Sequence, residues 1–89
     1  MEQHHSHPGI VKRLKRAQGH LASVIAMMEA QRPCVELAQQ LHAVEGAVAN
    51  AKRELIQDHV QHCLGDGVVS GETSPQRAVD EFKQLAKYL

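Results

Sequence analysis

One helical repeat after Pro33 restricts the fold of this sequence more than any other feature. Its apolar residues follow alternating steps of four and three, the spacing of one face of an α-helix; they are Leu37, Leu41, Val44, Val48, Ala51 and Leu55. Pro33 is compatible with the first turn of such a helix, and the pattern continues through His59 and Cys63 to Gly65-Asp66-Gly67. The sequence therefore predicts one long helix that starts at Pro33 and stops at residues 65–67.

Two shorter helices flank the long one. Two further sets of apolar residues each follow helical spacing. The N-terminal set consists of Ile10, Leu14, Ala17, Leu21, Val24, Ile25 and Met28, and the C-terminal set consists of Val79, Phe82, Leu85, Ala86 and Leu89. The first helix ends at Gln31-Arg32, because proline disfavours the helical conformation in the residue before it. After a turn-rich segment 65–75, Ser74 and Pro75 have the residue types of an N-cap and a first helical position. We predict an all-α, three-helix protomer: a single domain over residues 9–89, preceded by a flexible His-rich arm over residues 1–8.

The composition provides few large apolar side chains to fill the core of this protomer. A chain of 89 residues buries only about 60% of the surface that its unfolded form exposes. It also has one Phe, one Tyr and no Trp, while much of its aliphatic content is Ala, Leu and Val. Such helices can complete their apolar faces with a partner chain, so we expect a homo-oligomer.

The N-terminus and the cysteine usage indicate the cellular compartment. The polar, His-rich start does not have the pattern of a signal peptide, and no apolar run approaches the roughly 20 residues that span a bilayer. Two cysteines in such a chain are typical of thiols or metal ligands rather than of a structural disulfide. We therefore predict a cytoplasmic protein without membrane contact.

The two cysteines and one histidine form the strongest candidate site. His59 and Cys63 are four residues apart, so an α-helix places them on one face, and thiolate with imidazole favours copper(I), zinc, nickel or cobalt. Cys34 lies 25 residues before His59 on the same helix, roughly 37 Å away at 1.5 Å per residue. One chain cannot close this site, whereas two antiparallel helices crossing near the small residues around Ala47 and Val48 would build two identical sites.

The other histidines are weaker candidates. An N-terminal arm with His4, His5 and His7 can fold over an ion and add a ligand, or it can remain a solvated tail; the residues leave both interpretations open. His62 points about 100° away from Cys63 on a helix, which favours solvent or a supporting role. His20 and His42 have no partner of ligand type in register, so structural or exposed positions are expected for them.

A local basic cluster is the candidate nucleic-acid contact. Ten Lys+Arg balance ten Asp+Glu, so only the distribution of charge is informative. Four cations without an intervening acid, Lys12, Arg13, Lys15 and Arg16, are followed on the long helix by Lys52 and Arg53. A solvated face is the alternative reading, and no helix-turn-helix, zinc-finger or basic-zipper pattern occurs.

Residues 7–89 resemble the CsoR/RcnR family of bacterial metal-sensing repressors. The resemblance rests on Cys34, His59 and Cys63 within "CVELAQQLHAVEGAVANAKRELIQDHVQHCL", together with the opening "VKRLKRAQGHL" and the closing "FKQLAKYL". Two positions depart from the copper sensors: Pro33 stands where they have a Tyr, and no residue of the third helix is assigned to their Glu that supports the ligands. The His-rich opening is more similar to the nickel- and cobalt-responsive members.

This resemblance implies antiparallel dimers with a four-helix-bundle core, paired into tetramers. It also implies a repressor that binds operator DNA when metal-free, through the basic surface, and releases it on binding metal, so that metal efflux or resistance genes are expressed. Cys34, His59 and Cys63 would be the ligands, with His5 or His7 added and His4 or His62 less favoured. Nickel or cobalt is the first choice of metal, copper(I) the second and zinc the third.

Three other functions are alternatives to the metal-sensing repressor. A thiol-redox or persulfide sensor could use Cys34 and Cys63, but such family members lack a histidine at the position of His59. Formaldehyde sensors share the "VVSGETSPQRA" segment and lack the second Cys. A helical metal-storage protein would not bind DNA. An enzyme is not expected, because no nucleophile is accompanied by a base, and no small-molecule substrate is predicted.

Overall fold

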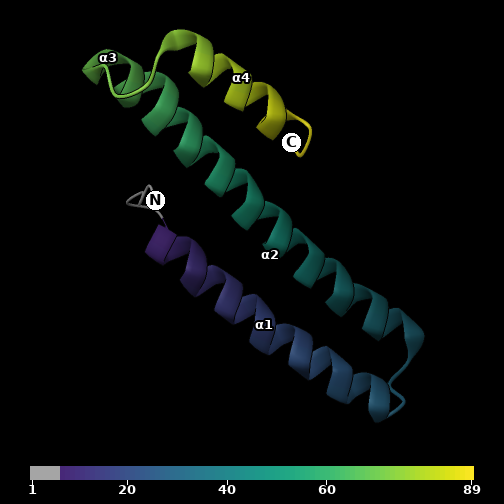
Figure 1. Ribbon diagram of the computed structural model, residues 1–89. Coiled ribbons are helices and arrows are strands. Elements are labelled where there is room, and N and C mark those ends of the chain that lie inside the picture. The colour runs from purple at the N-terminus through teal and green to yellow at the C-terminus, as the bar shows by residue number, and fades with distance from the viewer. Residues whose placement is uncertain (1–6) are drawn as a thin grey trace. The chain divides into compact units, whose positions relative to one another are not determined.

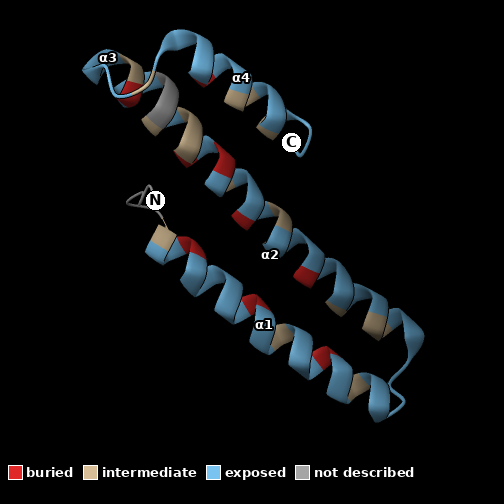
Figure 2. Ribbon diagram, viewed as in Figure 1, coloured by how far each residue is buried: buried red, intermediate tan, exposed pale blue. Residues whose placement is uncertain are grey.

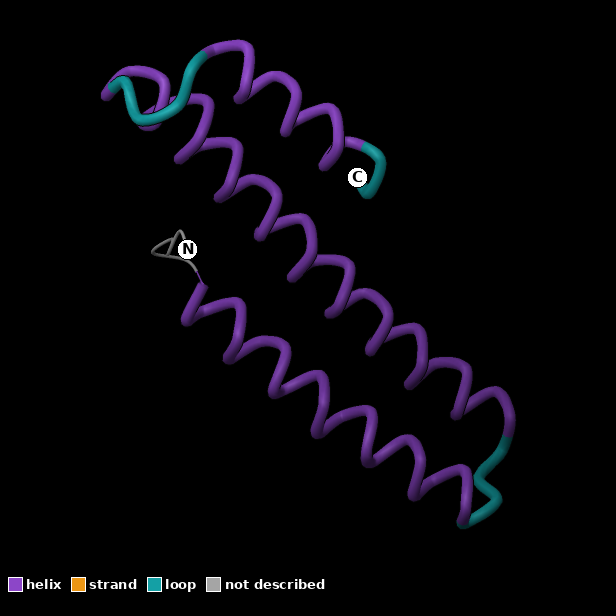
Figure 3. The backbone as a smooth tube through the Cα atoms, in the orientation of Figure 1, coloured by secondary structure: helices purple, strands orange, loops and turns teal. Residues whose placement is uncertain are grey.

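The computed structural model describes residues 7–89, except for the side chains of Cys63 and Leu64; His4 and His5 of the expected arm lie outside the described residues. The elements are α1 (His7–Glu29), α2 (Cys34–Val60), the π-helix η1 (Gln61–Gly67), the single turn α3 (Val68–Ser70) and α4 (Pro75–Ala86) (Figure 1). Over the described residues every regular element is helical (Figure 3). The prediction of an all-α protomer with three main helices, the second the longest, is confirmed.

The first helix ends as expected, through a backbone motif that holds its last carbonyls. The Arg32 amide donates to the Met27 carbonyl at 3.1 Å and the Gln31 amide to that of Met28 at 3.0 Å. Gln31 has a φ of 59°, the left-handed conformation that this helix-ending motif requires after the last turn. Pro33 therefore follows a helix that has already ended, and α2 begins directly after it.

The expected stop of the long helix at Gly65-Asp66-Gly67 is wrong. Instead, the α-helix ends at Val60 and the helical run continues through η1 and α3 as far as Gly71, whose φ is 83°. Gly67 serves a close approach rather than a turn, because a Cβ there would lie 3.0 Å from the His62 carbonyl oxygen and 3.4 Å from Thr73 Oγ1. The Thr73 amide donates to the Gly67 carbonyl at 3.1 Å, so the returning segment packs directly on this glycine.

The last helix starts where its sequence predicts. Ser74 is the N-cap in an extended conformation, its hydroxyl accepts from the Arg77 amide at 3.2 Å, and Pro75 occupies the first turn. The cap satisfies one of the amides that a helix start leaves without an intrahelical partner. Ala78 is the buried residue of α4. The residues three or four positions from Ala78 lie on the same face of this helix.

The described chain forms two compact units, residues 8–52 and residues 53–89 together with His7. In the first unit, both helices bury residues at seven-residue steps: Ile10, Ala17 and Val24 on α1, Val44 and Ala51 on α2 (Figure 2). A hydrogen bond of 2.7 Å between His20 Nε2 and Gln40 Oε1 joins the two helices. The long seam read from the sequence is thus only partly a core of the protomer.

A second apolar stripe on the first unit stays open. It consists of Leu14, Leu21, Met28, Leu41 and Val48, which are all exposed and repeat at seven-residue steps on each helix. Val48 exposes 46% of its surface, although it lies within the seam of the long helix. Exposed apolar side chains that repeat along a helix offer surface for protein–protein contact. No described helix is long and apolar enough to cross a membrane.

We predict that Gly71→Ala lowers the free energy of unfolding by about 1 kcal/mol, because a side chain at its left-handed φ is strained. Gly65→Ala is the matched control, since its Cβ would meet nothing within 4 Å and its φ is not positive. Urea unfolding followed by circular dichroism at one protein concentration measures both. Equal destabilisation by the two substitutions would contradict the assignment of Gly71 as the helix terminator.

Candidate metal centre

The long helix carries two of the three expected ligands at its two ends. Cys34 is the first residue of α2 and is an exposed free thiol, and His59 lies in the last turn. Because α2 is continuous from Cys34 to Val60, the 25 intervening steps separate the two residues by roughly 37 Å along the axis. The structure therefore does not bring Cys34 and His59 of one chain together.

His59 is paired with a carboxylate from the last helix. Its Nε2 lies 2.8 Å from Glu81 Oε1, and the His59 side chain is only 19% exposed. A carboxylate beside an imidazole orients the ring, an arrangement that is common for histidines that bind metal ions. Glu81 is therefore an acid on α4 beside His59, at a position that the sequence analysis left unassigned.

The sequence does contain a signal for Glu81. Ala78 is buried and Phe82 and Leu85 are half-buried, and positions 78, 81, 82 and 85 share one face of a helix. An acidic residue on the same face as these apolar residues indicates a polar neighbour, and the Glu81 side chain is 46% exposed. His59 is that neighbour.

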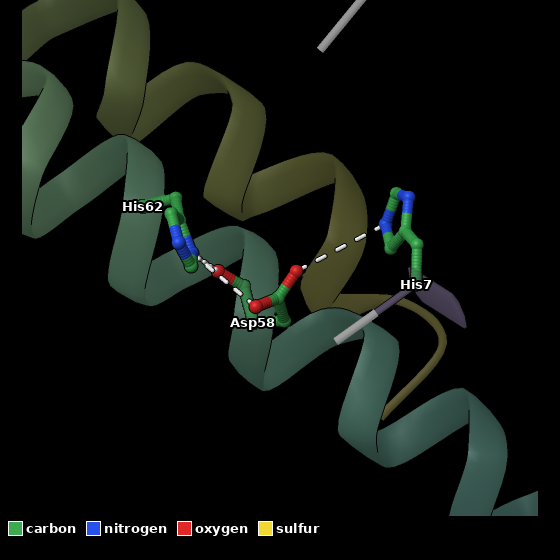
Figure 4. Close-up of polar contacts among 3 residues, drawn as sticks. All are labelled: His7, Asp58 and His62. Carbon is green, nitrogen blue, oxygen red and sulfur yellow. Dashed lines mark hydrogen bonds and ion pairs between the residues drawn. The ribbon is translucent and has the colours of Figure 1, made fainter. Parts of the chain in front are cut away.

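Asp58, the neighbour of His59, is a second acid that the sequence reasoning missed. It is 8% exposed and lies between two imidazoles (Figure 4). His62 Nδ1 is 3.2 Å from Asp58 Oδ1 and 2.9 Å from the Asp58 carbonyl oxygen, to which it donates. His7 Nε2 is 3.9 Å from Asp58 Oδ2. The spacing of Asp58 and His62, four residues apart in a helical segment, was the available signal.

The position of His7 bears on the role of the N-terminal arm. His7 is the first residue of α1 and groups with the second unit rather than with the rest of its helix. Its imidazole approaches Asp58, the residue directly before His59 in the chain. His7 and Pro8, which we expected in the N-terminal arm, lie in the first turn of α1.

Cys63 lies in η1, not in an α-helix. In a π-helix the backbone hydrogen bond spans five residues instead of four, so the α-helical face assumed for His59 and Cys63 applies only up to Val60. Isolated π turns occur frequently at functional sites. The side chain of Cys63 is outside the described residues.

The remaining histidines lie as the sequence indicates. His20 is half-buried and hydrogen-bonded to Gln40, and His42 is exposed on α2. Within the described part of the chain, no three His, Cys, Asp or Glu side chains are grouped to hold a metal ion. An exposed thiol and a carboxylate-supported imidazole are nevertheless the donor types that transition metals prefer.

The six basic residues proposed for nucleic-acid contact are all exposed. Four lie on α1, namely Lys12, Arg13, Lys15 and Arg16, and two lie on α2, namely Lys52 and Arg53. Arg13 and Arg16 also border a groove between α1 and α2. The surface is therefore open to a large anionic partner.

We predict that Glu81→Gln weakens metal binding by about tenfold or more, because the candidate ligand His59 loses the carboxylate that orients it. Glu72→Gln, an exposed acid before α4, is the control with the same change of charge. Cobalt(II) titration followed by visible absorption, with a competing chelator, measures both affinities. Identical losses in the two variants would mean that the pair of Glu81 with His59 has no specific effect on the site.

Comparison with known proteins identifies the family. The model of the metal-sensitive transcriptional repressor family matches residues 6–88. The copper-sensing transcriptional repressor CsoR of Bacillus subtilis (strain 168) is 36% identical over 80 residues, 88% of this chain and 79% of that protein. CsoR of Mycobacterium ulcerans (strain Agy99) is 35% identical over 78 residues, again 88% of this chain but 65% of that longer protein.

A solved structure extends the similarity to the fold. The nickel-responsive transcriptional regulator InrS superimposes with a TM-score of 0.83 at 29% identity, covering 100% of this chain and 99% of that one. The family consists of repressors and not of enzymes. The chain belongs to the metal-sensitive transcriptional repressor family, and it is a metal-sensing transcriptional repressor.

Proposed function

We propose that this repressor binds operator DNA when metal-free and releases it on binding nickel(II) or cobalt(II), which derepresses metal efflux or resistance genes. The proposed ligands are Cys34, His59 and Cys63, completed by His5 or His7 of the N-terminal segment. His4 and His62 are weaker candidates. The observation that carries this choice of metal is the approach of His7 to Asp58, which brings an N-terminal imidazole to the chain neighbour of His59.

The ligand set explains the proposed order of metals. Two thiolates, one imidazole and one further imidazole form a four-ligand set that square-planar nickel(II) and tetrahedral cobalt(II) or zinc accept. Copper(I) needs only Cys34, His59 and Cys63 and is therefore the second candidate. The similar proteins divide in the same way, since CsoR is described as copper-sensing and InrS as nickel-responsive. Zinc is the third candidate.

A homodimer is the smallest assembly that completes such a site. Cys34 and His59 lie at opposite ends of α2, so a second antiparallel α2 would set the Cys34 of one chain beside the His59 of the other. The open stripe on α1 and α2 offers the apolar surface for this contact. At the proposed crossing Val48 is exposed, and a Cβ on Gly46 would meet nothing within 4 Å. Two dimers would pair into the tetramer.

The basic residues of α1 and α2 are proposed to contact the phosphate backbone of the operator. A tetramer repeats the set four times, which makes binding strongly dependent on salt although the chain has equal numbers of acids and bases. The thiol-redox alternative is less favoured, because His59 with its Glu81 partner supports a metal instead. The formaldehyde alternative is less favoured because Cys63 is present.

We expect nickel(II) or cobalt(II), in a panel of buffered metals, to release the protein from operator DNA at the lowest free concentration. A variant with His4→Ala, His5→Ala and His7→Ala should require at least about tenfold more nickel, because it loses one ligand, yet keep its response to copper(I). His42→Ala, exposed and distant in sequence from these residues, is the control. Fluorescence anisotropy of labelled DNA measures release.

If the triple variant responds to nickel like the unchanged protein, the N-terminal histidines are not ligands. Copper(I) then becomes the leading candidate. If no metal changes DNA binding, release by metal is excluded.

We also predict complementation between two defective chains. Homo-oligomers of Cys34→Ala and of His59→Ala should each lose tight metal binding. After subunit exchange, mixed dimers that pair an intact Cys34 with an intact His59 and Cys63 should recover up to one site per dimer. Competition with a metal indicator measures this recovery, and its absence in demonstrably mixed oligomers would exclude a site shared between protomers.

A further inference from the structure

A groove in the first unit has a chemistry that the metal site does not use. It lies between α1 and α2, has a volume of about 330 Å³ and is lined by Arg13, Arg16, Ala17, His20, Ala47 and Asn50. The four residues from α1 share one helix face, at steps of three, one and three. All six belong to the same compact unit, so the groove is complete within one protomer.

The lining is rich in hydrogen-bond donors and small at its base. Arg13 and Arg16 carry permanently charged planar forks, and Asn50 adds an amide. Ala17 is buried and Ala47 half-buried, so methyl groups rather than long side chains line the groove between the donors. None of the described lining residues is acidic. Such a concave arrangement favours a small oxyanion with more than one oxygen.

His20 is held in place at this groove. Its Nε2 lies 2.7 Å from Gln40 Oε1 on α2, and because an amide oxygen accepts, that nitrogen donates. A fixed imidazole loses little conformational freedom when it contacts a ligand. His20 therefore differs from the long exposed side chains of Lys12 and Lys15, which lie on α1 outside the groove lining.

We propose that this groove binds one backbone phosphate of the operator, that Asn50 is a contact in addition to Arg13 and Arg16, and that His20, held by Gln40, is a positioning residue in the groove wall. The inference rests on the proposed DNA binding and deepens it, since it replaces a diffuse basic surface by a defined phosphate subsite. Phosphate contacts fix the register of a protein on the duplex without reading sequence. A free oxyanion has the same chemistry, and the experiment distinguishes the two sources.

Asn50→Asp tests the subsite, because it places a carboxylate in the groove with almost no change of shape. Gln39→Glu is the control, with the same change of charge on an exposed position of α2 outside the lining. The probe is a duplex selected by the metal-free protein from a random pool, with anisotropy as the readout. We expect Asn50→Asp to weaken binding about tenfold or more, as for loss of a charge-assisted contact, and Gln39→Glu less than threefold.

Methylphosphonate scanning makes the test specific to a phosphate. Neutralising one particular phosphate in each half-site should weaken binding by the unchanged protein and by Gln39→Glu, but leave the affinity of Asn50→Asp nearly unchanged. His20→Gln and its control His42→Gln are a second pair of variants in which Asn50 is unchanged. Neutralising the same phosphate should weaken DNA binding less in His20→Gln than in His42→Gln. Circular dichroism and cobalt binding confirm that each variant is folded.

Three results would overturn the proposal. Asn50→Asp and Gln39→Glu could weaken binding equally, or no single phosphate could be coupled to the groove. Inorganic phosphate could saturate the ring signals of His20 at micromolar concentration without DNA, while Asn50→Asp leaves operator affinity unchanged; the groove would then bind a free anion. Failure of the unchanged protein to bind any duplex would instead refute the proposed function itself.

Discussion

The length of α2 is the constraint on which the rest of the molecule depends. A continuous helix from Cys34 to Val60 holds an exposed thiol and a carboxylate-supported imidazole roughly 37 Å apart. Neither end offers a complete set of soft ligands by itself among the described residues. Under the proposed arrangement, metal binding and self-association become one requirement, since each ion would bridge two chains. The open stripe provides the surface for that association, and its stability would then depend on protein concentration.

The second unit contains the contacts of the candidate ligand His59 and of its neighbour Asp58. Glu81 reaches His59 from α4, while Asp58 contacts His62 in η1 and His7 at the start of α1. Two neighbouring residues of α2 thus contact three other elements through titratable side chains. A metal ion that takes His59 or His7 as a ligand would change the charge and orientation of these partners. This is the part of the fold in which ligand binding could be converted into movement of helices.

The sequence predicts the helices well and the contacts between them poorly. Apolar spacing, the Ser74-Pro75 start and the end of α1 near Gln31 are local features, so the all-α architecture follows from them. The end of the long helix does not, because Gly65 and Gly67 resemble terminators in sequence, whereas Gly67 is required by the packing of Thr73. Similarly, His59 and His7 each contact a residue that is distant in the sequence. Helix propensity does not specify which residues of two separate helices lie opposite each other. The contacts of Asp58 with His7 and of Glu81 with His59 were missed for this reason, whereas the spacing of Asp58 and His62 was a local signal.

Helix α1 links the two proposed activities of the repressor. Its first residue, His7, contacts Asp58 beside the candidate ligand His59, and its next three turns carry Arg13 and Arg16 in the groove. A helix transmits displacement along its axis because its backbone hydrogen bonds keep the turns in register. If metal coordination removed His7 from Asp58, the start of α1 would be repositioned, and the donors of the groove would move with it. The metal would then weaken DNA binding by misaligning phosphate contacts rather than by neutralising charge. This explanation is consistent with equal numbers of basic and acidic residues in the chain, because affinity then depends on the placement of a few cations and not on their total number.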